Sequence, residues 1–258
     1  IMSDSKILQQ HNECNRVQDP YSFRCIPQVH GPVQESFQKL IETVSIELNS
    51  STDNPLIFPT PENPGPHEVV SQGNFHAEVL ALVADAMSLG LFELSSISER
   101  RIDQMLDPDR RALRPFLAEN PGLESGLMIV QYVAAASLGE LRGHANPRTA
   151  FSTTTSAGQE DHVSMGATAS WNLLEAIQRC REVLACEAFV AHRAIQLIER
   201  PSSTCIESLI RCMNNVVQPG LTDRNTSEEI QTIAAEFTSS SWLSVIQSMI
   251  ETPLRKSL

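Results

Sequence analysis

The sequence lacks the patterns that mark several common classes of protein. It has no run of about 18 apolar residues, so we expect no membrane-spanning segment. It has no surplus of basic residues, and a formal net charge of −12 argues against nucleic acid or an anionic membrane as a partner. No glycine pattern of a nucleotide-binding loop is present. With 41% hydrophobic and 19% charged residues, the composition is that of a soluble globular protein.

Other absences exclude particular kinds of site. The 6 cysteines form no Cys-x-x-Cys pair and have no matching histidine spacing, so we expect neither a zinc site nor a redox pair. The serine of the segment from Gly122 to Gly126 is misplaced for a nucleophile elbow, and no strand precedes it. The first residues have neither the basic flank nor the apolar run of a signal peptide, so we expect a cytoplasmic protein.

Apolar residues recur at three- and four-residue steps along most of the chain, which indicates helices. Pro32 suits the first turn of a helix that continues to about Leu48, whereas the proline-rich stretch 55–66 predicts an exposed loop. No alternating strand pattern stands out. The sequence predicts one all-α domain over residues 1–258, a bundle of long, roughly aligned helices. The other expected helices are 75–101, 123–144, 159–199, 205–216 and 226–251.

The expected helix 75–101 is apolar on nearly every face. Such a helix belongs in the middle of a large bundle or in an interface between subunits. A chain that carries it needs cover on every side of the helix. We therefore expect this protein to form an oligomer.

The segment from Gln18 to Arg24, QDPYSFR, is the strongest candidate for a binding site. Arginine presents a rigid fork of donors that meets a carboxylate in two parallel hydrogen bonds. Tyr21 and Gln18 add groups that both donate and accept hydrogen bonds. In the alternative interpretation, Asp19 pairs with Arg24 and Tyr21 simply packs.

Six segments in the first two thirds of the chain resemble, in the same order, those of histidine ammonia-lyase and its relatives, the aromatic amino acid lyases and aminomutases. They are Gln18–Arg24, Ser51–Leu56, Gly73–Glu78, Ser98–Arg101, Ser125–Ile129 and Thr155–Met165. No resemblance is found beyond about Cys205. The resemblance implies the same all-α fold and an assembly of four complete units.

The resemblance also implies roles for individual residues. Arg24 would bind the carboxylate of an amino acid substrate with help from Gln18 and from Tyr21, a catalytic residue. Phe75 would lie over the electrophile of the family. Glu160 would be the second catalytic residue, near the amino group or an imidazole of the substrate, and its being glutamate rather than glutamine favours histidine.

Plainer interpretations exist for the same residues. Phe75 also fits ordinary packing at a helix start, and Glu160 fits an acid that a helix dipole stabilises. Gln159 and His162, expected on the same turn as Glu160, would have supporting roles only. His76 and Glu78 could suggest a metal, but residues two apart on a helix do not face each other. We therefore expect no metal.

The family's electrophile is absent from the chain. Members form a methylidene-imidazolone group from an internal Ala-Ser-Gly tripeptide, whereas here Leu138 follows Ala136 and Ser137, and the segment from Ser156 to Gly158 reads SAG. The chain resembles only the C-terminal half of the family. It is expected to need an N-terminal chain or subunit that carries the electrophile.

With such a partner, the reaction that the resemblance implies is β-elimination of ammonia from an L-amino acid, which gives an α,β-unsaturated acid. An aromatic amino acid 2,3-aminomutase is the alternative within the family. A non-catalytic assembly subunit or an inactive remnant is the alternative outside catalysis. Retention of Arg24 and Glu160 favours an active enzyme, because a remnant has no use for a group that binds carboxylates or for an acid that faces the substrate.

Overall fold

The computed structural model describes residues 4–11, 17–60, 63–111, 113–198 and 200–254. The chain divides into two compact units, and the fold is all-α apart from one hairpin, as the sequence predicts. Unit 1 comprises Ile1–Pro27, Ser95–Glu140 and Gln178–Leu258, and unit 2 comprises Gln28–Leu94 and Leu141–Ile177. That all 258 residues fold as one domain stays a prediction.

Three long helices contribute a part to each unit. They are α4 (Glu78–Leu106), α6 (Met128–His144) and α7 (Gly166–Ile198). The stretches 75–101, 123–144 and 159–199 predict all three helices, but the structure starts each one 3 to 7 residues later than expected.

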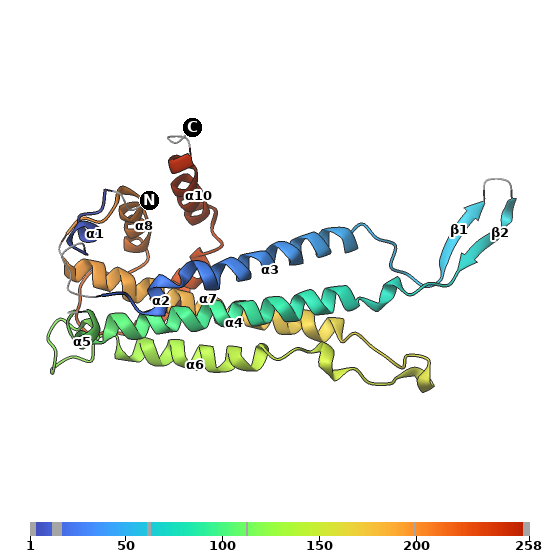
Figure 1. Cartoon of the computed structure of the whole chain (residues 1–258), viewed down its shortest axis with the longest axis horizontal. Coiled ribbons are helices and arrows are strands. Elements are labelled where there is room, and N and C mark those ends of the chain that lie inside the picture. Colours follow the sequence, from blue (N-terminus) through green and yellow to red (C-terminus); the bar gives the residue numbers. More distant parts are fainter. Residues whose placement is uncertain (1–3, 12–16, 61–62, 112, 199, 255–258) are drawn as a thin grey trace. The chain divides into compact units, whose positions relative to one another are not determined.

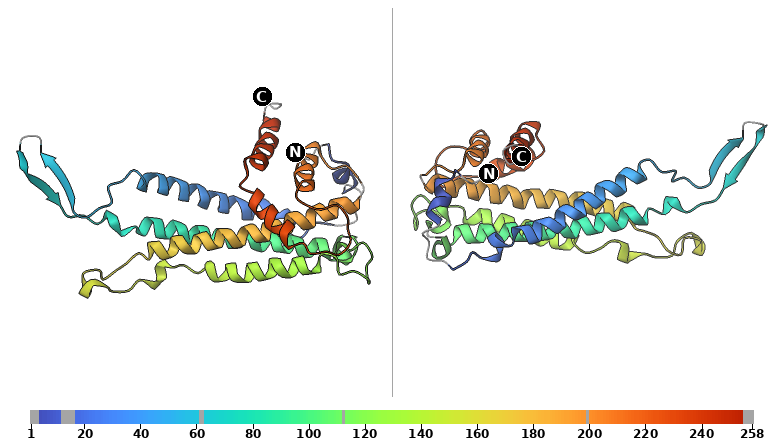
Figure 2. Two further views of the ribbon diagram at one scale, coloured as in Figure 1. Left: turned by 180° about the vertical axis from the view of Figure 1, so that it is seen from behind. Right: turned by 45° about the horizontal axis from the view of Figure 1, so that its top comes forward.

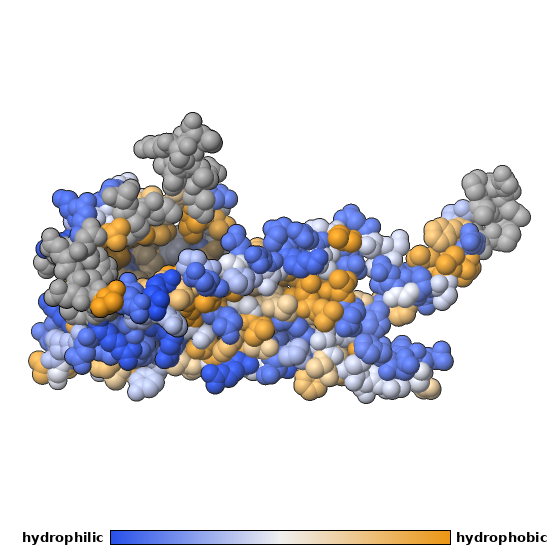
Figure 3. Space-filling view, viewed as in Figure 1, coloured by the Kyte–Doolittle hydropathy of each residue, from blue (hydrophilic) through white to orange (hydrophobic). Residues whose placement is uncertain are grey.

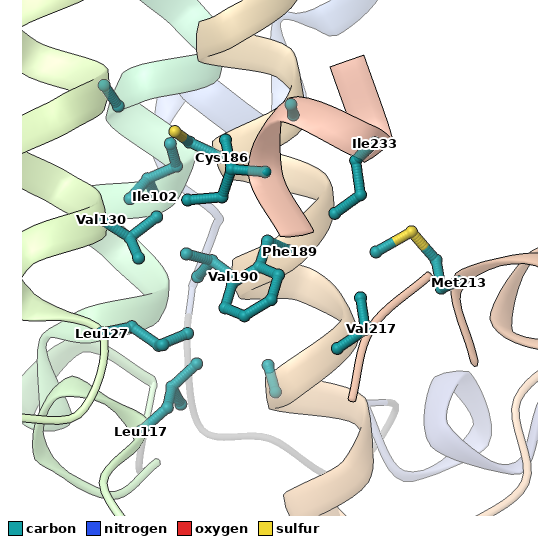
Figure 4. Close-up of a cluster of buried hydrophobic side chains, with 14 of the residues drawn as sticks. Ile102, Leu117, Leu127, Val130, Cys186, Phe189, Val190, Met213, Val217 and Ile233 are labelled. Carbon is teal, nitrogen blue, oxygen red and sulfur yellow. The ribbon is translucent and has the colours of Figure 1, made fainter. Parts of the chain in front are cut away.

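Unit 1 also contains short helices. They are α1 (Lys6–His11), α2 (Tyr21–Arg24), α5 (Pro108–Arg111), the 3-10 helix η2 (Pro115–Leu117), α8 (Thr204–Asn214), α9 (Ser227–Glu236) and α10 (Ser240–Leu254). Its core gathers large apolar side chains from its parts of α4, α6 and α7 around Phe189, which is 1% exposed (Figure 4). Val217, Ile233 and Trp242 extend this core toward the C-terminal helices.

The expectation of one helix over 226–251 is wrong. The chain leaves the helix at Phe237 and starts α10 at Ser240. The spacing of Thr226 and Glu229 is that of a capping box, but Thr226 makes no side-chain cap. The Glu229 carboxylate instead accepts hydrogen bonds from the backbone N–H of Gln218 and from Arg224. The Glu229 carboxylate therefore pairs with Arg224 and does not cap the helix.

Unit 2 contains most of α3 (Ile26–Glu47), strands β1 (Leu56–Thr60) and β2 (Asn63–Val70), and the 3-10 helices η1 (Asn74–His76), η3 (Thr149–Phe151) and η4 (Ser156–Gly158). Its parts of α3 and α4 run side by side (Figures 1 and 2). A Cβ added at Gly90 would lie 3.6 Å from the Val33 side chain, so the two helices approach closely there. The fully buried apolar cluster of the unit is small, and its residues are Ala81, Ala84 and Ala169.

The start expected for α3 is wrong, because Pro32 lies inside the helix. Proline removes one backbone donor and is disfavoured in a helix interior by about 3 kcal/mol. The next residue, Val33, packs against α4 at Gly90. The helix begins at Ile26, before the proline.

The proline-rich stretch is likewise not simply a loop. It forms an antiparallel hairpin in which Leu56 pairs with Val70, Ile57 with Val69, and Phe58 with Glu68. Each strand of a two-stranded sheet has one open edge, where proline is tolerated because no ladder donor is required. Figure 3 shows apolar side chains on this hairpin and along α3 and α4.

One described segment, Asn74–Leu106, has the length and mean hydropathy, 1.6, of a helix that could cross a membrane. The core helix of a soluble protein meets the same criteria, and half of its most apolar window is buried. In unit 2 this segment also carries the buried Asp85, which accepts hydrogen bonds from the backbone N–H groups of Arg148 and Thr149, each at 2.9 Å. These observations fit a helix packed within protein.

The described cysteines form no disulfide, and Cys14 lies outside the described residues. Burial raises the pKa of the Cys186 thiol to about 12. Such a thiol stays protonated and unreactive at neutral pH.

Candidate active site

The segment from Gln18 to Arg24 lies in unit 1 and forms the short helix α2. The Pro20 carbonyl accepts hydrogen bonds from the N–H groups of Phe23 and Arg24 at 3.0 and 3.1 Å, which tightens the turn. The guanidinium of Arg24 lies over the Tyr21 ring, 4.4 Å from its centroid. The structure therefore brings Gln18, Tyr21 and Arg24 together at an open cavity of about 550 Å³. Its other lining residues are Asp19, Pro20, Gln104, Asp109 and Arg110.

Arg24 is exposed, and its donors are available to a ligand. Its guanidinium contacts the Tyr21 ring, and the pairing of Asp19 with Arg24 stays an alternative interpretation. The face of an aromatic ring attracts a cation, so the Tyr21 ring helps to hold the guanidinium in place. This arrangement suits a carboxylate.

A partly buried ion pair supports α2. Arg101 is bonded through two nitrogens to the Glu187 carboxylate and donates to the backbone carbonyl of Ser22 at 3.4 Å. Ser98 donates to the same carboxylate at 2.5 Å. The segment Ser98–Arg101 thus anchors the backbone that carries Arg24, a role that the sequence pattern alone did not assign.

Phe75 lies in unit 2, in the 3-10 helix η1 just before α4. Its side chain is 52% exposed and lines an apolar cavity of about 620 Å³. Most of the other lining residues come from α3, α4 and α7, among them Leu40, Val44, Leu80, Ala84, Leu173 and Ile177. Plain core packing, the alternative for this residue, does not describe a phenylalanine that is half exposed at a cavity.

Glu160 is also in unit 2, but its expected place at a helix start is wrong. It lies in a loop that η4 begins, six residues before α7, where Ser156 and Ala157 have φ values of 49° and 53°. Its backbone pairs with Thr155 through a hydrogen bond of 2.8 Å from the Thr155 N–H. The loop, rather than a helix dipole, sets the environment of Glu160.

Hydrogen bonds hold the Glu160 side chain in its charged form. The Thr155 hydroxyl donates to the carboxylate at 2.5 Å, and this bond, followed by one from Ser156, lowers the pKa of Glu160. The carboxylate is exposed and therefore anionic at neutral pH. It can meet a cationic ammonium or imidazolium group.

Side chains next to Phe75 and Glu160 join their two segments. The His76 ring nitrogen Nε2 lies 2.9 Å from the backbone carbonyl of His162, and the two rings stack with centroids 5.6 Å apart. His162 and Gln159 do not share a helical turn with Glu160, contrary to expectation. The loop of Glu160 is thus fastened to the turn of Phe75.

The expectation that His76 and Glu78 lie on one helix and do not face each other is wrong. Ala77 between them adopts left-handed backbone with φ 61°, so the two residues do not share one helix. The Nδ1 atom of His76 lies 3.7 Å from Oε2 of Glu78. With His162 they form a group whose ligand atoms lie within 4.8 Å of one another. Sequence reasoning missed this group because a left-handed alanine leaves no local signal.

The fold is similar to that of ammonia-lyases and aminomutases. The crystal structure of histidine ammonia-lyase from Trypanosoma cruzi matches with a TM-score of 0.84 and 35% identity, over 90% of this chain and 45% of that one. The phenylalanine aminomutase from Pantoea agglomerans matches with a TM-score of 0.77 and 30% identity, over 88% of this chain and 45% of that one.

Sequence comparison identifies the family. The profile described as aromatic amino acid lyase matches residues 1–216. A histidine ammonia-lyase from Bacillus mycoides (strain KBAB4) is 41% identical over 235 residues, which are 91% of this chain and 45% of that protein. The chain belongs to the aromatic amino acid lyase family. It spans less than half the length of these relatives, as expected for the C-terminal half.

Proposed function

We propose that these residues form the C-terminal part of a histidine-type ammonia-lyase, which eliminates ammonia from an L-amino acid to give an α,β-unsaturated acid. The electrophile comes from an N-terminal partner chain, and the complete unit assembles as a cytoplasmic tetramer without nucleic acid or membrane. The observation that carries this proposal is the available guanidinium of Arg24 beside Tyr21 and Gln18 at one cavity. An amino acid substrate has the carboxylate that this group would bind.

The residues present fit the methylidene-imidazolone group of the family. Phe75 is half exposed at an apolar cavity, so its ring is available to pack against a planar group brought by another part of the protein. When bound, that group supplies the electrophile that turns the substrate amine into a leaving group. The chain itself contains no Ala-Ser-Gly, so the group has to come from outside these 258 residues.

Each of the chain's own residues then has one task. Arg24 fixes the substrate carboxylate in two parallel bonds, with Gln18 as a further hydrogen-bonding group. Tyr21, a catalytic residue, is exposed beside Arg24 and can donate or accept a hydrogen bond through its hydroxyl. Such fixed orientation is worth several kcal/mol of barrier, roughly 7 to 11 kcal/mol for an ideal geometry.

Glu160 bears on the identity of the substrate. Because Thr155 lowers its pKa, the carboxylate is anionic and favours a substrate that carries a positive charge near it. The amino group of any amino acid and the imidazole of histidine both meet this requirement. The relatives named histidine ammonia-lyase support the second.

The likeness to an aminomutase from Pantoea agglomerans supports the second candidate, a 2,3-aminomutase. Such an enzyme returns the ammonia to the β-carbon, so the two candidates differ in how long the eliminated product is retained. A non-catalytic assembly subunit is the third candidate. It would assemble in the same way, but its assembly would have no activity that depends on Arg24 or Glu160.

Product analysis tests the proposal. The protein, purified from its own source with any chain that accompanies it, is incubated with L-histidine, L-phenylalanine and L-tyrosine. Free ammonia with an unsaturated acid, formed fastest from histidine, is the expected result. A β-amino acid would replace the lyase with the aminomutase, and no turnover of any of the three would contradict both.

A further inference from the structure

The group His76, Glu78 and His162 has no task in the proposed reaction, yet its geometry is that of a ligand set. His76 ends η1, Glu78 begins α4, and His162 lies in the loop before α7, all within unit 2. Their ring nitrogens and carboxylate oxygens lie within 4.8 Å of one another. Two histidines and one carboxylate are a common donor set for zinc.

The backbone holds the two segments of this group together independently of the side chains. Ala77, in left-handed conformation, turns the chain between His76 and Glu78. A Cβ added at Gly166 would lie 3.5 Å from both the Cβ and the carbonyl oxygen of Ala77, so the start of α7 packs on this turn. The turn that carries His76 and Glu78 is therefore packed against the start of α7, four residues after His162.

The hydrogen bonding of His76 leaves two acceptors facing each other. Its Nε2 lies 2.9 Å from the carbonyl oxygen of His162, which only accepts, so Nε2 carries the proton. In the neutral ring, Nδ1 then presents a lone pair, and it lies 3.7 Å from Oε2 of Glu78. That oxygen is buried and has no hydrogen-bond partner in the described part of the chain. A cation or a proton between the two atoms would satisfy both.

The surroundings favour a metal ion over a proton. A histidine that binds a metal usually donates its other ring N–H to a carboxylate, a backbone carbonyl or water. The His162 carbonyl has this role for His76. Tetrahedral zinc with bonds of about 2.0 to 2.2 Å separates its ligands by roughly 3.4 Å, close to the observed 3.7 Å. The exposed ring of His162 stacks on His76, and one of its ring nitrogens lies within 4.8 Å of the other two ligand atoms.

We propose that His76 Nδ1, Glu78 Oε2 and a ring nitrogen of His162 bind one zinc ion, with water as the fourth ligand. The ion fastens the loop that carries Glu160 to the turn that carries Phe75. It takes no part in the proposed elimination, and zinc binding does not depend on that proposal. Failure of one therefore leaves the other intact.

Metal titration of the purified protein, with any chain that accompanies it and with thiols reduced, tests the site. Zinc is titrated by calorimetry, and cobalt(II) is used as a spectroscopic probe. We expect one ion per chain, a cobalt spectrum without a sulfur charge-transfer band, and slower amide exchange of residues 155–163 on zinc binding. Glu78→Gln and His162→Ala are each expected to weaken zinc binding by at least about 10-fold.

His30→Ala removes a histidine of α3 outside the group and should leave zinc affinity unchanged. Glu78→Gln preserves size, and His162 is exposed, so circular dichroism should report a native fold for both variants. The proposal is overturned if no zinc binds, if cobalt shows thiolate ligation, or if affinity is the same in wild type and both variants. In the first case, a proton held between His76 and Glu78 accounts for their geometry.

Discussion

The two units differ in how completely they bury their own apolar side chains. Unit 1 surrounds Phe189 with a continuous core from its long and short helices, whereas the buried apolar cluster of unit 2 consists of three alanines. Unit 2 also leaves large side chains exposed, including Trp171 at 69% and Leu48 at 80%. A core of alanines buries little apolar area, and burial contributes about 25 cal/mol per Å². We therefore expect unit 2 to be the part that is covered by another chain or subunit.

The residues of the candidate site are divided between the same two units. Gln18, Tyr21 and Arg24 belong to the well-packed unit, where a partly buried ion pair supports them. Phe75 and Glu160 belong to the unit that leaves more apolar surface exposed. We expect the group that binds the carboxylate to be formed by this chain alone, and the environment of Phe75 to be completed by the partner.

The largest expected effect on stability tests the core of unit 1. Phe189→Ala removes a ring that is 1% exposed, so it should lower the free energy of unfolding by about 3 to 5 kcal/mol. Trp171→Ala in unit 2 is the matched control and should change it by about 0.5 kcal/mol or less in the chain alone. Urea unfolding measures both. Equal losses of unfolding free energy in the two variants would contradict the difference in packing between the units.

The next effect concerns activity. Arg24→Ala removes the fork that orients the substrate carboxylate and should lower turnover by at least about 100-fold. Arg24→Lys keeps the charge without the fork and should recover only part of this loss. Steady-state kinetics of the assembled enzyme measure both variants. Wild-type turnover in Arg24→Ala would contradict the assignment of Arg24 as the group that binds the substrate carboxylate.

A smaller effect is the dependence of stability on pH. His192 is 4% exposed, and its pKa is lowered by burial first and then by the charge of Arg193. Because the unfolded state binds the proton more readily, stability should be full above about pH 6.5 and fall as pH decreases through the folded pKa. One such group contributes at most about 1.4 kcal/mol per pH unit.

The variant His192→Gln should flatten this dependence. Urea unfolding between pH 5 and pH 8, the range over which histidine titrates, compares it with wild type. An unchanged slope in the variant would show that other groups cause the pH dependence.

The smallest expected effect concerns Glu160. Thr155→Val removes the strongest cause of its lowered pKa, so that pKa should rise toward its ordinary value. The acid limb of the pH–rate profile should move to higher pH in the variant. Thr154→Val is the control, because the Thr154 hydroxyl donates to the Asp161 carbonyl and not to Glu160. Equal shifts in both variants would contradict a specific role for Thr155.

The sequence predicts the long helices and the segments of the site, because both depend on local patterns. Apolar spacing is sufficient for α4, α6 and α7, whereas the roles that the resemblance implies for Arg24 and Phe75 stay predictions. Local sequence patterns could not reveal left-handed alanines such as Ala77 and Ala157. Alanine favours helices, and only tertiary packing overrides that preference. The group His76, Glu78 and His162 depends on one of these residues and was therefore missed.

Other errors also arise from tertiary structure. The hairpin of unit 2 forms despite its prolines because each strand keeps an open edge. The break before Ser240 and the loop of Glu160 interrupt stretches that look helical from composition. Glu229 is the clearest example. Its spacing from Thr226 is that of a capping box, but its carboxylate forms an ion pair with Arg224 instead.

The intact and native masses of the protein purified from its own source test the central claim most directly, because they show what completes the site. We predict a complex with a second chain that contains an Ala-Ser-Gly segment and is lighter than its sequence by the water lost on forming the electrophile. A single longer polypeptide with both parts would keep the site and remove the separate partner. A complex of these 258 residues alone, with no such segment, would contradict the catalytic account and leave only the fold.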